Sequence, residues 1–172
     1  SALMIGVSDT NDPTGTWRLY QFDVDATNNN WFDYPSFGFN RNWIVITGNL
    51  FKVSDNSFSN SIVFVFDKPA LYAATPPTPT VFNRPSSEGN TFCPAITLDN
   101  SMNTEYLVSS FNTSNLRIYT ITGTASAPVF TATSLFPSGS PWSFKPATTN
   151  FAPQSGGAAL INNGDHRMQN AV

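Results

Sequence analysis

The sequence predicts an all-β protein, and three observations carry that prediction. No stretch of twelve or more residues has a clean helical period of apolar residues, whereas short apolar runs separated by turn residues are frequent. Only 11% of the residues are charged, and most polar positions hold Asn, Ser or Thr, which compete with helix backbone hydrogen bonds. In addition, a pattern of strand starts recurs along the chain.

Individual strands follow from alternation and from turn residues between apolar runs. Residues 3–7 and 17–24 flank a turn at 11–15 and predict a hairpin whose second strand is half exposed. Residues 43–46 and 62–66 are continuously apolar, so both of these strands should be buried on both faces. Further strands are expected at residues 106–111, 116–121 and 129–135.

The recurring strand start has an offset of 94 − 35 = 59 residues, and it matches Pro35, Phe37 and Phe39 with Pro94, Ile96 and Leu98. Units of about 40–60 residues with three or four strands are typical of β-propeller blades. We therefore expect a partial β-propeller made of antiparallel four-stranded blades; a β-sandwich is the alternative. The expected boundaries are 1–25 for the end of one blade, 33–90 and 91–153 for two blades, and 165–172 for the start of the next.

Three stretches of the chain carry recognisable motifs: residues 6–17, which contain Asp-Pro-Thr-Gly, residues 33–39, which open with Asp-Tyr-Pro, and residues 164–168, Gly-Asp-His-Arg-Met. Together they resemble a family of large secreted bacterial proteins with predicted β-propeller domains. The resemblance implies a propeller scaffold that is secreted or on the cell surface, without agreed catalytic residues. The turn at 12–17 also looks like the Asp-box hairpin of sialidase-like propellers, with one extra residue before Gly15.

Charge and residue usage exclude several functional classes. The net charge is −3 and Lys and Arg do not cluster, so nucleic-acid binding has no electrostatic basis. The longest apolar run, residues 62–66, is far shorter than the roughly 20 residues of a membrane helix, so membrane insertion is not expected. The single Cys93 excludes an internal disulfide and a Cys-based structural zinc site, and the single His166 removes most catalytic sites that depend on histidine.

Candidate ligand-binding residues lie near the predicted strand starts. Trp31 and Tyr34 adjoin a run of three Asn residues, and exposed aromatic rings beside amides suit sugar stacking, although packing explains them equally well. Asp33 and Asp165 each open a strand that would line the central channel of a propeller; hydrogen bonding to the backbone is the structural alternative. Arg167 follows at the third start and is the remaining candidate.

A calcium site is the only metal site that the sequence suggests. Asp9, Asn11 and Asp12 offer the oxygen ligands that Ca²⁺ prefers. The spacing is not that of an EF-hand, and the same side chains are suited to closing a turn. We therefore keep calcium and a purely structural turn as alternatives, and no other cofactor is expected.

Two functions remain open at this stage. The first is a non-catalytic scaffold or recognition module, with glycans as candidate ligands. Its partners would be the remainder of a larger propeller or copies of itself, because the apolar faces of the end blades would otherwise be exposed to water. The second is part of a sialidase-like or other carbohydrate-active hydrolase, which requires a carboxylate pair or a Tyr nucleophile with clustered arginines. The arginines are scattered along the chain, so the sequence favours the first function.

Overall fold

The computed structural model describes residues 1–73, 77–143, 151–157, 159–162, 164 and 167–172. The elements are antiparallel strands joined by short connections, so the predicted all-β class is confirmed. The first sheet contains β3 (Asn30–Phe39), β4 (Trp43–Lys52), β5 (Phe58–Asp67) and β6 (Thr80–Pro85). The second contains β7 (Cys93–Pro94), β8 (Glu105–Asn112), β9 (Asn115–Thr124) and β10 (Ala127–Pro137). In both sheets, neighbouring strands follow one another in the sequence.

Shorter elements lie before and after the two sheets. An N-terminal hairpin pairs β1 (Ala2–Ser8) with β2 (Trp17–Asp23), and a small hairpin pairs β11 (Phe151–Ala152) with β12 (Ile161–Asn162). A five-residue helix, α1 (Lys68–Tyr72), follows β5, and single 3-10 turns span Ser86–Glu88 and Ser155–Gly157. The sequence patterns did not predict α1, β6, β11 or β12.

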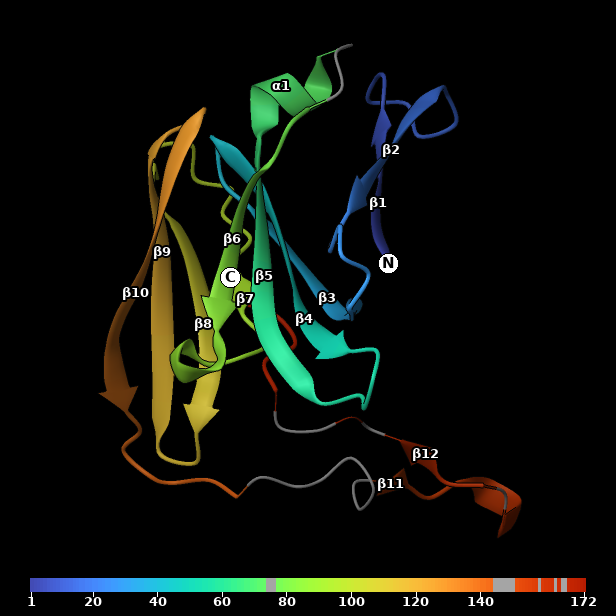
Figure 1. The fold of residues 1–172 in the computed structure, drawn as a ribbon, viewed down its shortest axis with the longest axis vertical. Coiled ribbons are helices and arrows are strands. Elements are labelled where there is room, and N and C mark those ends of the chain that lie inside the picture. Colours follow the sequence, from blue (N-terminus) through green and yellow to red (C-terminus); the bar gives the residue numbers. More distant parts are fainter. Residues whose placement is uncertain (74–76, 144–150, 158, 163, 165–166) are drawn as a thin grey trace.

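The β3–β6 sheet is covered on both faces, as the continuous apolar runs predict. Figure 1 shows it between the β1–β2 hairpin and the β7–β10 sheet. On β4, Ile44 and Ile46 belong to the cluster shared with the hairpin, whereas Trp43 and Val45 belong to the cluster shared with β7–β10. Successive strand residues point to opposite faces, so two apolar faces require an uninterrupted apolar run.

Strand pairing repeats with the predicted offset of 59 residues. Ser36 lies opposite Thr47 in the β3–β4 ladder. Adding 59 to each gives Ala95 and Tyr106, and the Ala95 N–H donates to the Tyr106 carbonyl at 2.9 Å. The turns that follow are also alike, because Asn40 Oδ1 accepts from the Asn42 N–H at 2.8 Å and Asp99 Oδ1 from the Ser101 N–H at 2.8 Å.

The first strands of the two sheets lie side by side and parallel. Phe39 forms a parallel bridge with Ile96, and the Phe39 N–H donates to the Ala95 carbonyl at 3.0 Å. A Cβ added to Gly38 would lie only 2.5 Å from the Ala95 oxygen, so glycine permits this close approach. Near the C-terminus, Ala171 forms a second parallel bridge with Ala95.

Candidate ligand-binding site

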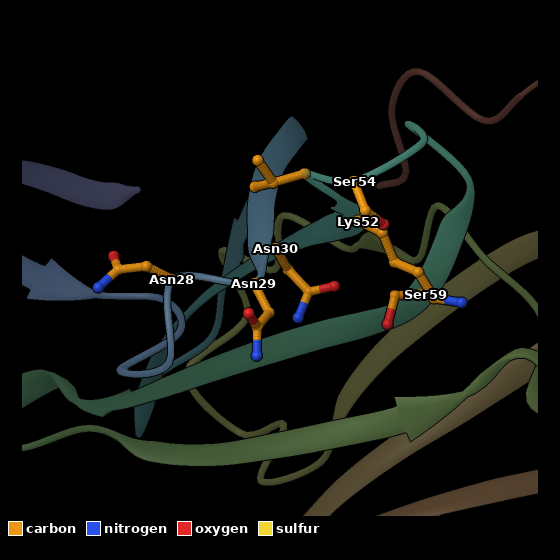
Figure 2. A pocket seen from close by; sticks show the side chains of 7 residues that line it. Asn28, Asn29, Asn30, Lys52, Ser54 and Ser59 are labelled. Carbon is orange, nitrogen blue, oxygen red and sulfur yellow. The ribbon is translucent and has the colours of Figure 1, made fainter.

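A polar pocket lies beside the end of β4, between the connection that leads into β3 and the turn from β4 to β5 (Figure 2). Its cavity measures about 460 Å³. Polar side chains dominate the lining, which consists of Asn28, Asn29, Asn30, Lys52, Val53, Ser54 and Ser59. Figure 2 shows Lys52 and Ser59 close together at one end, while Asn28 points away from them.

Asp25 holds the asparagine wall of this pocket in place. Its two carboxylate oxygens accept hydrogen bonds from the Thr27 N–H and hydroxyl, the Asn29 and Asn30 N–H groups, and the Asn30 side-chain amide. The Thr27 hydroxyl and then the Asn30 amide hold the pKa of Asp25 well below its usual range. Asp25 therefore stays ionised throughout the pH range in which the protein would act. The Asp-x-Thr spacing, typical of an Asx turn, was the available sequence signal.

The opposite wall is the tight turn between β4 and β5, and a backbone hydrogen bond joins it to the asparagine wall. The Lys52 N–H donates to the Ser57 carbonyl at 2.9 Å, and Asn56 takes the left-handed conformation at φ 57° that this reversal needs. The Val53 N–H donates to the Asn29 carbonyl at 2.8 Å and so joins the two walls. The pocket is thus shaped by fixed backbone on both sides.

Two polar groups of the lining have no hydrogen-bond partner among the described residues. Asn30 Oδ1 is buried and accepts none, while the Asn30 amide nitrogen donates to Asp25. The Lys52 ammonium donates no hydrogen bond to any residue that the structure describes, although it acts at longer range on Asp55 and lowers the pKa of that carboxyl. The pocket therefore presents the Lys52 ammonium to a ligand.

The indole of Trp31 belongs to the sheet rather than to the pocket lining. Its ring stacks on Phe51 with centroids 5.1 Å apart, and Phe51 in turn contacts Phe58 edge-on at 5.7 Å. The Trp31 Nε1–H donates to Asn56 Oδ1 at 3.1 Å. Trp31 therefore packs across three strands and supports the β4–β5 turn.

Tyr34 and Arg167 are the two predicted ligand residues that the fold brings together. The Arg167 guanidinium lies 4.6 Å from the centre of the Tyr34 ring. Tyr34 has a φ of 54° at a β-bulge in β3, a conformation that a tyrosine rarely adopts. Asp33 is half-buried and pairs with Asn49 on β4. Asp165 lies outside the described residues.

The three residues proposed for calcium lie in and before the β1–β2 turn. Asp9 forms an ion pair with Arg18 at 2.6 Å, and Asp12 Oδ1 accepts from the Thr14 N–H and hydroxyl. Asn11 is exposed. Within the described part of the chain, no group of three or more acidic, Cys or His side chains could hold a metal ion. These contacts fit a structural turn, and the calcium alternative stays a prediction.

A buried carboxyl group lies between the two sheets, where the sequence analysis proposed no site. Glu105 is fully buried, and neither of its carboxyl oxygens has a hydrogen-bond partner among the described residues. Burial raises the pKa of Glu105 to about 8, against the opposing attraction of Lys68. The carboxyl therefore remains largely protonated at pH 7. Its burial makes it a feature of the core rather than of a ligand site.

Four of the described arginines bind carboxylate or carbonyl groups of the protein. Arg18 binds Asp9, Arg84 binds Glu88, Arg41 donates to the Asn100 carbonyl and Arg117 to the Thr133 carbonyl. Arg117 also reaches the Ser87 carbonyl at 3.4 Å, and Arg84 and Arg117 both lie near Tyr119. His166 lies outside the described residues.

No protein-family model, curated protein or solved structure matches this chain. The resemblance to secreted propeller proteins therefore stays a prediction. Among the described residues, no helix has the length and apolar character needed to cross a membrane.

Proposed function

We propose that this chain is a non-catalytic recognition module built on part of a β-propeller, and that the asparagine-lined pocket binds a glycan. The observation that carries the scaffold proposal is the repeated parallel contact of first strands, Phe39 with Ile96 and Ala95 with Ala171. In a propeller, the innermost strands of successive blades surround one axis while the sheets stack face to face. Two stacked four-stranded sheets of this kind support that arrangement.

The chemistry of the pocket supports a hydroxyl-rich ligand. Amide side chains both donate and accept, and the lining offers three of them together with two serine hydroxyls. A volume of about 460 Å³ falls within the 300–1,000 Å³ that is usual for small-ligand sites. We place the protein outside the cytoplasm, as the resemblance to secreted propeller proteins implies.

The two outer faces of the stacked sheets, on the β1–β2 hairpin and on β7–β10, expose apolar side chains. This supports the proposal that further sheets, from the same protein or from copies of this chain, cover these faces. The hairpin exposes Met4, Trp17 and Leu19, whose side chains are 63%, 47% and 76% exposed. The β7–β10 sheet exposes Tyr106 and Val129, at 41% and 55%. Apolar side chains in such patches favour association.

The isolated chain should therefore associate as its concentration rises, which light scattering would show as a growing mass. Leu19→Lys should reduce the association without lowering the unfolding temperature, because this side chain lies almost entirely in solvent. A monomer that stays monomeric at high concentration and binds no hydrophobic dye would contradict the proposed incomplete stack.

Glycan binding is tested by titrating the chain with purified neutral and acidic oligosaccharides and following backbone NMR resonances. We expect shifts at residues 28–30 and 52–59. Asn29→Ala should weaken binding about tenfold, as expected for the loss of one well-placed hydrogen bond from an exposed lining amide. Asp25→Ala should weaken it as well, by releasing the asparagine wall. Asn115→Ala, in the β8–β9 turn, is the matched control and should bind normally. Equal weakening by this variant, or no resonance shift with any sugar, would refute glycan binding in this pocket.

A further inference from the structure

We infer that the pocket selects an acidic sugar, with the Lys52 ammonium binding the carboxylate of a uronic acid unit. This inference rests on the proposed glycan-binding function and adds the ligand class. Among the residues that line the pocket, Lys52 is the one charged side chain. A carboxylate brought beside it meets an opposite charge and no lining carboxylate.

Lys52 is available for this contact, whereas the other described lysine is not. Lys68 donates to the Asn40 carbonyl at 3.0 Å and lies 4.6 Å from the centre of the Phe39 ring. The Lys52 ammonium has no hydrogen-bond partner among the described residues and forms no ion pair with them. In a chain of net charge −3, an unpaired cation in a pocket is a local site for an anion.

The nearest competitor for Lys52 is Asp55, in the same turn. Its carboxylate accepts from the Ser57 N–H at 2.9 Å, and hydrogen bonds from Ser57 lower its pKa more than Lys52 does. Asp55 is therefore satisfied locally and attracts Lys52 only at longer range. A carboxylate bound in the pocket can approach the ammonium directly and form a charge-assisted hydrogen bond.

The rest of the lining favours a sugar acid over a simple anion. The side chain of Asn29 is exposed in the lining, and an amide can both donate to and accept from a ring hydroxyl. The Ser59 hydroxyl adds another group of the kind that binds ring hydroxyls. One cation and several polar side chains beside it together match a carboxylate on a polyhydroxylated ring.

Calorimetry with a galacturonate trisaccharide and a neutral galactose trisaccharide tests this inference. At low salt, the acidic trisaccharide should bind at least about tenfold more tightly than the neutral one, and the difference should shrink as salt is added. Lys52→Met should remove the preference by weakening the acidic trisaccharide far more than the neutral one. Asp55→Asn, which removes the competing carboxylate, should increase the preference. Circular dichroism of each variant confirms folding.

The outcomes separate the two proposals. Equal affinity for both trisaccharides, unaffected by Lys52→Met, would overturn the acidic-sugar inference and leave glycan binding intact. Binding of neither trisaccharide, together with unshifted pocket resonances, would overturn glycan recognition itself.

Discussion

Replacing Glu105 by glutamine should stabilise the protein at pH 8 by about 2–4 kcal/mol, because each unit of pKa difference between folded and unfolded states corresponds to about 1.4 kcal/mol. Glu105 is buried without hydrogen-bond partners among the described residues, and burial raises its pKa to about 8. In the unfolded chain, the same carboxyl loses its proton near its ordinary pKa of 4.5. Glutamine has nearly the same shape and needs no proton to stay neutral.

The sign of the pH dependence follows from proton binding. Between pH 4.5 and 8 the folded state holds the Glu105 proton and the unfolded state releases it, so wild-type stability should fall as the pH rises through this range. Below pH 4.5 the two states are equally protonated at this site, and Glu105→Gln should match the wild type. Urea unfolding at several pH values measures this directly.

The chain's other glutamate provides the control. Glu88 forms a surface ion pair with Arg84, so Glu88→Gln should retain the wild-type slope between pH 4.5 and 8. A wild-type unfolding free energy that does not change across this range would mean that Glu105 is solvated or paired, contrary to the structure.

Replacing Trp43 by alanine should destabilise the protein by about 3–5 kcal/mol, the usual cost of truncating a buried aromatic side chain. Trp43 is fully buried in the cluster that joins the two sheets. Its Nε1–H donates to the Ala125 carbonyl at 3.0 Å, which lies between β9 and β10. The substitution therefore removes buried side-chain volume and a direct hydrogen bond between the sheets.

Two further variants resolve these contributions in chemical denaturation. Trp43→Phe keeps most of the ring but leaves the Ala125 carbonyl without its donor, so it should cost about 1–3 kcal/mol. Trp17→Ala, in the exposed face of the hairpin, should cost less than either. A Trp43→Ala variant as stable as Trp17→Ala would mean that the two sheets do not pack through this residue.

Local features of the fold could be predicted because their causes lie within a few residues. Apolar runs at 43–46 and 62–66 required burial on both faces, and the structure places them in the two core clusters. The turn joining β8 and β9 falls at the expected residues, 112–115. Even α1 had a local signal, since Asp67 caps its first turn and Pro69 follows, a pattern easily overlooked in so short a helix.

The pocket could not be predicted because its two walls are brought together by strand pairing. Asn30 lies opposite Lys52 only in the register that β3 and β4 adopt, and that register includes a bulge between Asp33 and Ser36. From the sequence, the aromatic neighbours of the asparagine run looked as suited to a ligand as the amides. The structure uses Trp31 for packing and leaves the amides and Lys52 to line the cavity.

The all-β class, the main strands and the 59-residue repeat follow from the amino-acid sequence, because alternation and turn chemistry act over short distances. Whether a repeated position is buried depends on how the sheets assemble. Ile46 and Glu105 are equivalent by this offset, since 46 + 59 = 105, and both are buried, yet one is apolar and the other a carboxylic acid. Burial between the assembled sheets makes Glu105 a neutral acid. Lys52 stays exposed and is the accessible charge of the pocket.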